Sequence, residues 1–224
     1  MSMVDLHYLF EDRKEAGRKS AERILRRRFR TEAMVLALSP GGVLIGSEIA
    51  SAFGLPLELF ILNKLSVPGN PERTFGAVTE GGKIFLNAEV VTRYEIPDSY
   101  IQQAILSQRR KIQNHQRLYS KKRKRPNFQS KEIIVTDDGV QSGATLLAAL
   151  QTLRARGAER VTTAIPVAPE EWVEKIKNAS DEAIILHAIP FFSRLNDYYR
   201  RFDPVSQDEV IAIIRKANDG KKAA

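Results

Sequence analysis

Five short apolar runs recur along the chain, and segments with helical periodicity lie between them. Runs of this kind, unbroken by polar residues, are typical of parallel strands that helices cover on both faces. The predicted strands are 33–38, 57–62, 133–135, 161–167 and 183–189. The predicted helices around them are 10–29, 43–53, 144–156 and 169–177. This alternation predicts an α/β fold with a doubly wound, mainly parallel five-stranded sheet flanked by helices.

The middle of the chain departs from this alternation. Residues 65–82 are rich in proline and glycine, which predicts a mobile loop followed by a short hairpin. A long basic helix, about 100–119, comes next, with Asp98 and Ser99 suited to cap it. We expect one domain over residues 1–224, in which residues 219–224 form a disordered tail.

The composition excludes several classes of protein. With 43% hydrophobic and 28% charged residues, the 224-residue chain has a globular rather than a disordered composition. It has no cysteine, which excludes disulfides, a thiol nucleophile and zinc–cysteine sites, and its three histidines show no metal-ligand spacing. No apolar run approaches the ~18 residues of a membrane span and the start lacks a leader pattern, so we expect a soluble, cytoplasmic protein with no membrane partner.

The charge is strongly basic. Lys and Arg number 35 against 27 Asp and Glu, and the net charge of +8 indicates an anionic partner without identifying it. Much of the excess lies in three runs, at 26–30, 109–111 and 121–125. For any one such run, a solvated helix face or loop is more common than a nucleic-acid site.

The loop after the third predicted strand is the richest in chemistry. It reads Thr-Asp-Asp-Gly-Val-Gln-Ser-Gly-Ala-Thr over residues 136–145. A helix N-terminus with free N–H groups and hydroxyls, here from Ser142 and Thr145, binds phosphate. Asp137 and Asp138 would repel a phosphate, and they suit ribose hydroxyls or a hydrated Mg²⁺. Asp-Asp-Gly by itself is also a turn former, but a strand, two acids, a small-residue loop and a helix start in this order are more restrictive.

Residues 132–145 resemble the 5-phosphoribosyl-1-pyrophosphate (PRPP) binding motif of type I phosphoribosyltransferases. The resemblance extends to most of the chain, including Val-Pro-Gly-Asn-Pro-Glu at 67–72 and the Tyr198-Tyr199 segment, and points to a bacterial and archaeal branch of unassigned substrate. It implies a small hood, placed at about 190–216, and a flexible loop. It also implies a Mg²⁺-dependent enzyme that transfers ribose 5-phosphate from PRPP to a nitrogenous base or similar acceptor, releasing pyrophosphate.

The resemblance implies a role for each site residue. Asp137 and Asp138 would hold the ribose hydroxyls and would meet Mg²⁺ through those hydroxyls or water; with Lys64 they are the predicted catalytic residues. The 5-phosphate would be held by the loop residues Gly139, Val140, Gln141, Ser142, Gly143, Ala144 and Thr145. Pyrophosphate would be held by Ser39, Pro40, Gly41, Gly42, Lys64 and Arg73. Phe192 and Tyr199 are candidates to stack on the base, although aromatic residues at a strand end more often serve as core or lid packing.

Two residues depart from the family pattern. Pro40 stands where a basic residue commonly precedes the Gly-Gly pair, and Gln141 stands where purine salvage enzymes carry an acid. Because the family often has a cis peptide in the first loop, we expect a cis Ser39–Pro40 bond, whose cost is only ~0.5–1 kcal/mol.

These departures keep a second function open, a non-catalytic PRPP or nucleotide sensor with a regulatory role that contacts nucleic acid through its basic helix. A third, nucleic-acid binding without PRPP, leaves Asp137 and Asp138 unexplained. Family resemblance also implies a homodimer. The acceptor is not identified by the sequence.

Overall fold

The computed structural model describes residues 8–24, 29, 32–119 and 126–219. The predicted basic runs at 26–30 and 121–125 lie outside these residues except for Phe29, and so does the predicted tail beyond Asp219. The strands are β1 (Ala33–Ala37), β2 (Leu57–Leu59), β3 (Leu62–Val67), β4 (Asn70–Thr79), β5 (Ile84–Leu86), β6 (Glu132–Thr136), β7 (Arg160–Pro169) and β8 (Glu182–Ile189). The helices are α1 (Arg13–Ile24), α2 (Pro40–Phe53), α3 (Ala88–Arg93), α4 (Asp98–Tyr119), α5 (Ala144–Ala155), α6 (Glu170–Ala179) and α7 (Gln207–Asn218), with a 3₁₀ turn η1 (Leu195–Tyr198).

Five strands form one parallel sheet in the order β2-β1-β6-β7-β8, which confirms the predicted fold class. The chain leaves β1 for β2 on one side and returns to β6 on the other side of β1. The order in which the chain adds strands therefore reverses between β1 and β6. Ligands bind at such a switch point, beyond the carboxyl ends of the strands. Ala37 pairs with Thr136 there, so the loops at 38–39 and 137–143 leave the sheet side by side.

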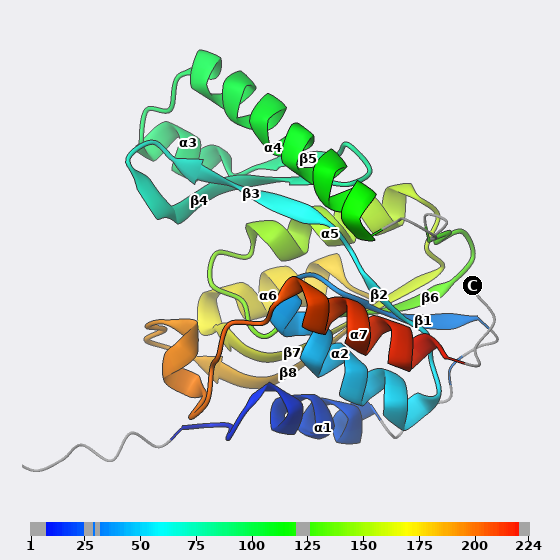
Figure 1. Cartoon of the computed structure of the whole chain (residues 1–224). Coiled ribbons are helices and arrows are strands. Elements are labelled where there is room, and N and C mark those ends of the chain that lie inside the picture. Colours follow the sequence, from blue (N-terminus) through cyan, green and yellow to red (C-terminus); the bar gives the residue numbers. More distant parts are fainter. Residues whose placement is uncertain (1–7, 25–28, 30–31, 120–125, 220–224) are drawn as a thin grey trace, which may run out of the picture.

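Helices cover both faces of this sheet, as Figure 1 shows. Along β1 the side chains alternate: Val35 and Ala37 pack with α1, α2 and α7, whereas Met34 and Leu36 pack with α5 and α6. All five residues of β1 and of β6 are buried. The unbroken apolar runs that predicted these strands are thus explained by burial on two faces.

A second, antiparallel sheet, β3-β4-β5, stands apart from the first (Figure 1) and corrects the prediction for residues 65–82. Turn residues at 68 and 69 join two strands of a hairpin there rather than forming a long loop. Leu65, Phe75 and Val78 are buried against Ile101 and Ile105 of α4. The second sheet with α3 and α4 lies over α5, where Thr152 Oγ1 and Thr79 Oγ1 are 3.3 Å apart. From here on we call this element the hood, and it differs from the hood predicted at about 190–216.

Several predicted boundaries shift. Helix α2 begins at Pro40 and not at Val43, because the Ser39 hydroxyl caps it and proline is favoured in the first turn. All described peptide bonds are trans, so the predicted cis Ser39–Pro40 bond is wrong. Helix α7, within residues expected to form the hood, instead packs on the main sheet beside α2.

None of the helices in the described ranges has both the length and the apolar character needed to cross a membrane.

Candidate active site at the carboxyl edge of the sheet

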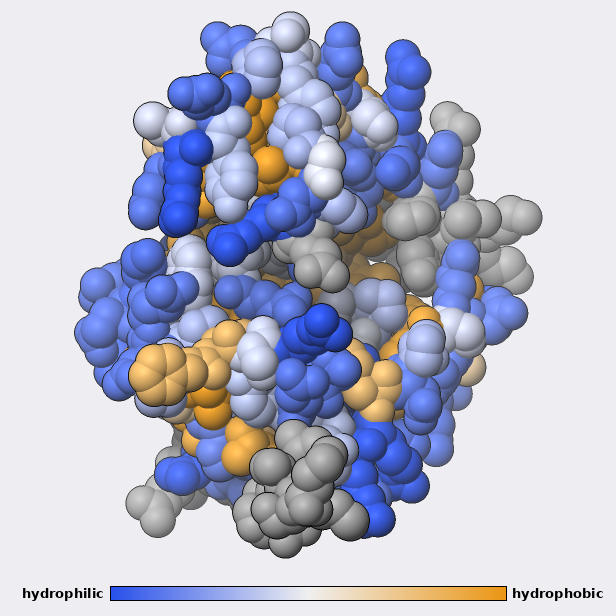
Figure 2. Space-filling model, turned by 90° about the vertical axis from the view of Figure 1, so that its left-hand side faces the viewer, coloured by the Kyte–Doolittle hydropathy of each residue, from blue (hydrophilic) through white to orange (hydrophobic). Residues whose placement is uncertain are grey.

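A pocket of about 280 Å³ opens at the carboxyl edge, where β1 and β6 meet. Its walls come from the β1–α2 junction, β3 of the hood, the β6–α5 loop and η1; the lining includes Ser39, Pro40, Lys64, Asp137 and Asp138. Figure 2 looks onto this edge, which is hollowed between the hood above and the main sheet below. The fold thus brings together residues from separate segments that the sequence assigned to one site.

Asp137 is half-buried and closely partnered. Its Oδ1 accepts hydrogen bonds from the Ser39 hydroxyl and from the Asp138 backbone N–H, the latter at 2.9 Å. Burial and the neighbouring Asp138 charge raise the pKa of Asp137 to about 7, against the opposing effects of the Ser39 hydrogen bond and the Lys64 charge. Asp137 therefore changes charge near neutral pH.

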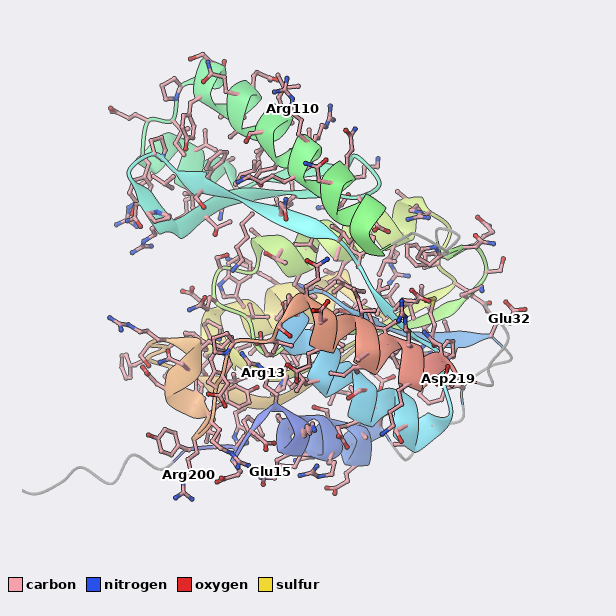
Figure 3. The ribbon with its side chains drawn as sticks, in the orientation of Figure 1. Arg13, Glu15, Glu32, Arg110, Arg200 and Asp219 are labelled. Carbon is pink, nitrogen blue, oxygen red and sulfur yellow. The ribbon has the colours of Figure 1, made fainter. Side chains whose placement is uncertain are left out.

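Asp138 has a different environment, because a buried arginine holds it. Arg13 Nε lies 2.9 Å from Asp138 Oδ2, and the two side chains are only 9% and 12% exposed. Arg13 also donates to the Asp203 carbonyl at 2.8 Å and stacks over the Phe202 ring at 3.5 Å. Figure 3 places Arg13 at the start of α1, next to the segment that leads into α7. The carboxylate of Asp138 is thus held by a buried cation, whereas the Asp137 carboxylate is held by the Ser39 hydroxyl and a backbone N–H.

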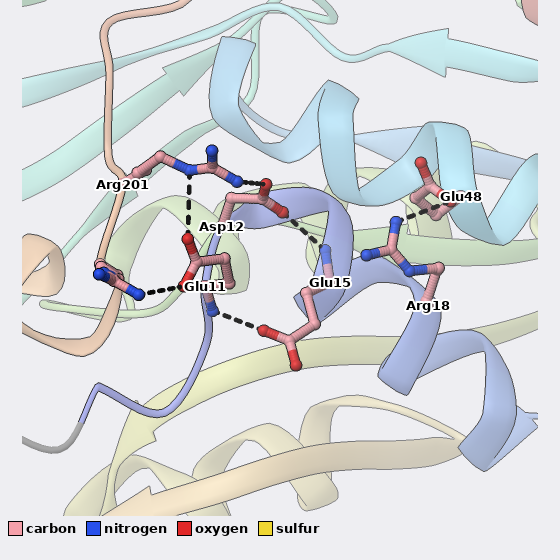
Figure 4. A network of polar contacts seen from close by, with 7 residues as sticks. Glu11, Asp12, Glu15, Arg18, Glu48 and Arg201 are labelled. Carbon is pink, nitrogen blue, oxygen red and sulfur yellow. Dashed lines mark hydrogen bonds and ion pairs between the residues drawn. The ribbon is translucent and has the colours of Figure 1, made fainter.

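Segments near both ends of the described chain converge on Asp138. The Tyr199 hydroxyl donates to the Asp138 backbone carbonyl at 2.6 Å, and Tyr199 forms an isolated parallel backbone bridge with Phe10. Arg201 binds Asp12 at 2.9 Å and Glu11 at 3.5 Å, as Figure 4 shows. This network joins the start of α1 to the segment after η1 and so supports the position of Arg13.

The β6–α5 loop leaves several backbone N–H groups without acceptors at the start of α5, an arrangement that we call the cradle. Among the described residues, no acceptor takes the N–H groups of Ser142, Gly143 or Thr145, whereas Val140 N–H donates to Val167 O and Ala144 N–H to Ser142 O. The Thr145 hydroxyl is buried and has no hydrogen-bond partner in the described part of the chain. A buried unpaired hydroxyl is costly, so its presence beside free N–H groups at a helix start indicates that a ligand completes it.

Glycines shape this loop for a physical reason. Gly143 has φ +63°, and a Cβ there would lie 2.2 Å from the Trp172 ring. A Cβ on Gly139 would lie 2.2 Å from Leu195 of η1. The cradle is therefore pressed between α6 and η1, which keeps its N–H groups in place.

The first loop is arranged differently from the expectation. Ser39 and Pro40 line the pocket, but Gly41 and Gly42 are buried in the first turn of α2. A Cβ on Gly41 would lie 1.9 Å from Asp138 Oδ2, and one on Gly42 would lie 3.0 Å from Asp137 Cα. These two glycines thus allow α2 to approach the acidic pair, and their backbone does not line the pocket.

The two cations predicted to hold pyrophosphate line different cavities. Lys64, on β3, lines the pocket with the two acids. Arg73, on β4, lines a larger neighbouring cleft of about 1000 Å³, which shares Gln141 and Ser142 with the first pocket.

The two aromatic residues predicted to stack on the base lie in different environments. Tyr199 is 1% exposed and packs between Phe10 and Phe202, so its ring is not available to a ligand. Phe192 packs on Tyr198 at 5.0 Å and lines the larger cleft. We therefore do not retain Tyr199 as a candidate for stacking on a base.

Sequence reasoning missed Arg13 and Trp172 as site residues. Arg13 is one of several basic residues in an amphipathic helix, and nothing local distinguishes it from the exposed ones. Trp172 is 7% exposed and belongs to the core, and its closeness to Gly143 also makes it a wall of the cradle.

The chain is similar to known proteins over most of its length. A family model described as the phosphoribosyl transferase domain matches residues 10–186. Over 210 residues the chain is 33% identical to proteins named "Putative phosphoribosyl transferase" in two strains of Mycobacterium tuberculosis. The match covers 94% of this chain and 47% of each relative, so the chain spans about half the length of the curated relatives it matches. A solved structure, TT1426 from Thermus thermophilus, is 33% identical with a TM-score of 0.76, covering 92% of this chain and 98% of that one.

Proposed function

The chain belongs to the phosphoribosyl transferase family, and on that premise we propose that it transfers the ribose 5-phosphate group of PRPP to a nitrogenous acceptor and releases pyrophosphate. The observation that carries the proposal is the cradle at the start of α5. Free N–H groups and the unpaired Thr145 hydroxyl lie one loop away from Asp137 in the described structure. A ribose 5-phosphate needs an anion site and an acceptor for its hydroxyls, and this pocket offers both.

Each group at the site has a separate task in this reaction. The free N–H groups of the cradle and the Thr145 hydroxyl bind the 5-phosphate. Ionised Asp137 accepts hydrogen bonds from the ribose hydroxyls, and Lys64, which lines the same pocket, places positive charge near the leaving group. The acceptor nitrogen supplies the electron pair of the new bond to the anomeric carbon, and pyrophosphate leaves with the pair of the old C–O bond. Positive charge develops at the ribose, so ionised Asp137 stabilises the transition state electrostatically.

Mg²⁺ fits this site only together with the substrate. In the described part of the chain, no group of three or more Asp, Glu, His or Cys side chains could hold a metal ion. Asp138 is already paired with Arg13, so the chain offers mainly Asp137. Mg²⁺ is commonly held by one or two carboxylates plus substrate phosphates, and PRPP supplies those phosphates. When bound, the ion would neutralise the departing pyrophosphate.

The test is PRPP binding with and without Mg²⁺, followed by pyrophosphate release across a panel of nitrogenous acceptors. We expect PRPP to raise the melting temperature of the protein, and Asp137→Asn to reduce that shift. Lys83→Gln, on the exposed turn before β5 and outside the pocket, is the control. Equal stabilisation of the native protein and the Asp137→Asn variant, or none in either, would refute PRPP binding at this site.

One observation favours a second function, a PRPP sensor without turnover. Pro40 replaces a cation, and Gly41 and Gly42 are packed against the acids, so the first loop presents little to bind pyrophosphate. PRPP binding of normal strength with no pyrophosphate release for any acceptor would support the sensor. Release with one acceptor would establish the enzyme.

A further inference from the structure

The larger cleft beside the pocket has a composition that the 5-phosphate and ribose sites do not explain. It measures about 1000 Å³ and lies between the hood, on one side, and α6 with the turn after β8, on the other. Gln141 and Ser142 line both cavities, so a ligand in the cleft can reach a substrate held by the cradle.

Cations from four segments converge on this cleft: Arg73 of β4, Arg93 of α3, Lys175 of α6 and Arg194 before η1. None of them makes an ion pair with a described residue. Two acids, Glu89 and Glu171, also line the cleft, so positive side chains outnumber negative ones by two. A cleft lined by an excess of one charge concentrates ligands of the opposite charge.

The same cleft presents aromatic surfaces. Phe191, in the turn after β8, is 94% exposed. Phe192 beside it is fixed against Tyr198, whose hydroxyl accepts a hydrogen bond from Ser193 N–H at 3.0 Å. Trp172 also lines the cleft, with Lys175 Nζ 4.4 Å from its ring centre. The exposed Phe191 ring, in a cleft with an excess of cations, suits a flat ring that carries negative charge.

The size of the cleft is compatible with such a ligand. At about 1000 Å³ the cleft lies at the upper end of the roughly 300–1000 Å³ that is usual for ligand pockets, so a ring and its anionic substituent have room in it. The cradle lies in the other pocket, so the 5-phosphate of PRPP does not require the four cations of the cleft.

We propose that this cleft receives the acceptor, and that the acceptor is an anionic heterocycle: a flat nitrogen-containing ring that bears a carboxylate or a phosphate group. The inference rests on the proposed transfer reaction and narrows its acceptor. Arg93 and Arg194 bind the anionic group from opposite sides of the cleft, and Phe191 and Phe192 contact the ring.

The experiment compares ligands that share a ring and differ in charge. Isothermal titration at about 0.15 M salt measures nicotinate against nicotinamide, orotate against uracil, and pyridoxine phosphate, which carries its phosphate without a ribose, against pyridoxine, with and without PRPP. We expect at least one anionic member to bind about tenfold more tightly than its neutral partner, because a charge-assisted hydrogen bond is worth roughly that factor. The carboxylate and phosphate pairs show which anionic group the cleft prefers.

Substitutions test which residues cause the preference for the anionic ligand. Arg93→Gln/Arg194→Gln should remove the preference for the anionic member and leave PRPP binding unchanged. Arg110→Gln, on the exposed side of α4 and outside the cleft, should retain the preference (Figure 3). Charged and neutral partners that bind equally, anions that bind nowhere, or a preference that survives the double substitution would each overturn the inference.

The outcomes also separate this inference from the proposed function. PRPP binding without a charge preference would overturn the acceptor class and leave the transfer proposal intact. A charge preference without PRPP binding would refute the transfer reaction, and with it the assignment of this ligand as an acceptor. A single-stranded oligonucleotide that binds more tightly than every heterocycle, with loss in the double variant, would assign the cleft to nucleic acid instead.

Discussion

At the scale of single residues, the two adjacent acids of the site differ in what holds them. Asp138 faces Arg13 in a nearly closed environment, whereas Asp137 faces Ser39, the pocket and a like charge. Two neighbouring carboxylates in one site ionise less readily than two isolated ones. Arg13 is therefore the partner of Asp138, whereas burial and the neighbouring Asp138 raise the pKa of Asp137 to about 7.

The first prediction concerns the pH dependence of PRPP binding. Because burial and Asp138 raise the pKa of Asp137 from 3.8 to about 7, its carboxylate becomes available to ribose hydroxyls only as the pH rises through about 7. PRPP affinity, measured by titration calorimetry from about pH 5.5 to 8.5, should rise across this range. The same series with Asp137→Asn reports the ionisation of PRPP itself, and an identical slope in both proteins would contradict the prediction.

The raised pKa also affects stability with a defined sign. Between about pH 4 and 7 the folded protein keeps a proton on Asp137 that the unfolded chain has lost, so this group's contribution to stability falls as the pH rises through that window. Asp137→Asn should therefore flatten the decline in melting temperature between about pH 4 and 7.

The second prediction concerns the pairing of Arg13 with Asp138. Arg13→Gln leaves a buried carboxylate without its partner and should lower the free energy of unfolding by about 3–5 kcal/mol. Adding Asp138→Asn removes the unpaired charge and should restore much of that loss, as chemical denaturation of the single and double variants will show. Additive losses would mean that the pair is not coupled.

The third prediction uses the unpaired Thr145 hydroxyl. Thr145→Val removes a buried group without a partner among the described residues, so stability should stay the same or rise, while PRPP affinity falls about tenfold. Thr152→Val is the matched control, since the Thr152 hydroxyl already donates to Ala148 O at 2.7 Å. It should cost about 1 kcal/mol of stability and leave PRPP affinity unchanged. The reverse pattern would exclude Thr145 as a phosphate ligand.

At the scale of elements, the cradle depends on the junction between the β6–α5 loop and α6. Gly143 combines a left-handed backbone with contact to the Trp172 ring, whereas Gly69 has the same backbone region and nothing within 4 Å. Gly69→Ala should therefore cost about 1 kcal/mol, from the backbone strain alone. Gly143→Ala should cost clearly more and should also weaken PRPP binding, because the ring or the loop must move. Denaturation midpoints of the two variants, if equal, would contradict this packing role.

Sequence reasoning succeeded where the determinants are local. Strands β1, β6 and β7 are apolar runs buried on two faces, and the acids, the loop and the start of α5 follow one another in one segment. It failed for β3 and β4, because Gly76 was taken as a loop signal. A Cβ at Gly76 would lie 2.3 Å from the Phe85 carbonyl, so this glycine permits close approach of β5 within a sheet.

The remaining part of the site depends on contacts between distant residues. Arg13 and Asp138 are separated by 125 positions, and the choice of this arginine over its neighbours depends on the segment from Tyr199 to Asp203, which only the fold brings near. The packing of Gly41 and Gly42 against the acids has the same origin, because it requires β1 and β6 to be neighbours. No periodicity or motif in one sequence contains this information.

At the scale of the whole molecule, the chain has separate apolar clusters. The hood contains its own, with Leu65, Phe75 and Val78 fully buried against α4. The two clusters of the main sheet lie on its opposite faces, and one of them includes α5, over which the hood lies. Regions with separate cores commonly open in separate steps.

The last prediction is that the hood opens before the main sheet. Hydrogen exchange measured by mass spectrometry should show weaker protection for β3, β4 and α4 than for β6 and β7. Ile105→Ala, which makes a cavity in the hood cluster, should lower protection in the hood by about 2–4 kcal/mol and leave β6 unaffected. Ile134→Ala, in the main sheet, should lower protection in β6 and β7. Because the larger cleft is lined in part by hood residues and Lys64 lies on β3, such opening would change access to the site while the cradle stays formed. If Ile105→Ala lowers protection in β6 as much as in α4, the molecule opens as one unit and the hood cannot move independently of the cradle.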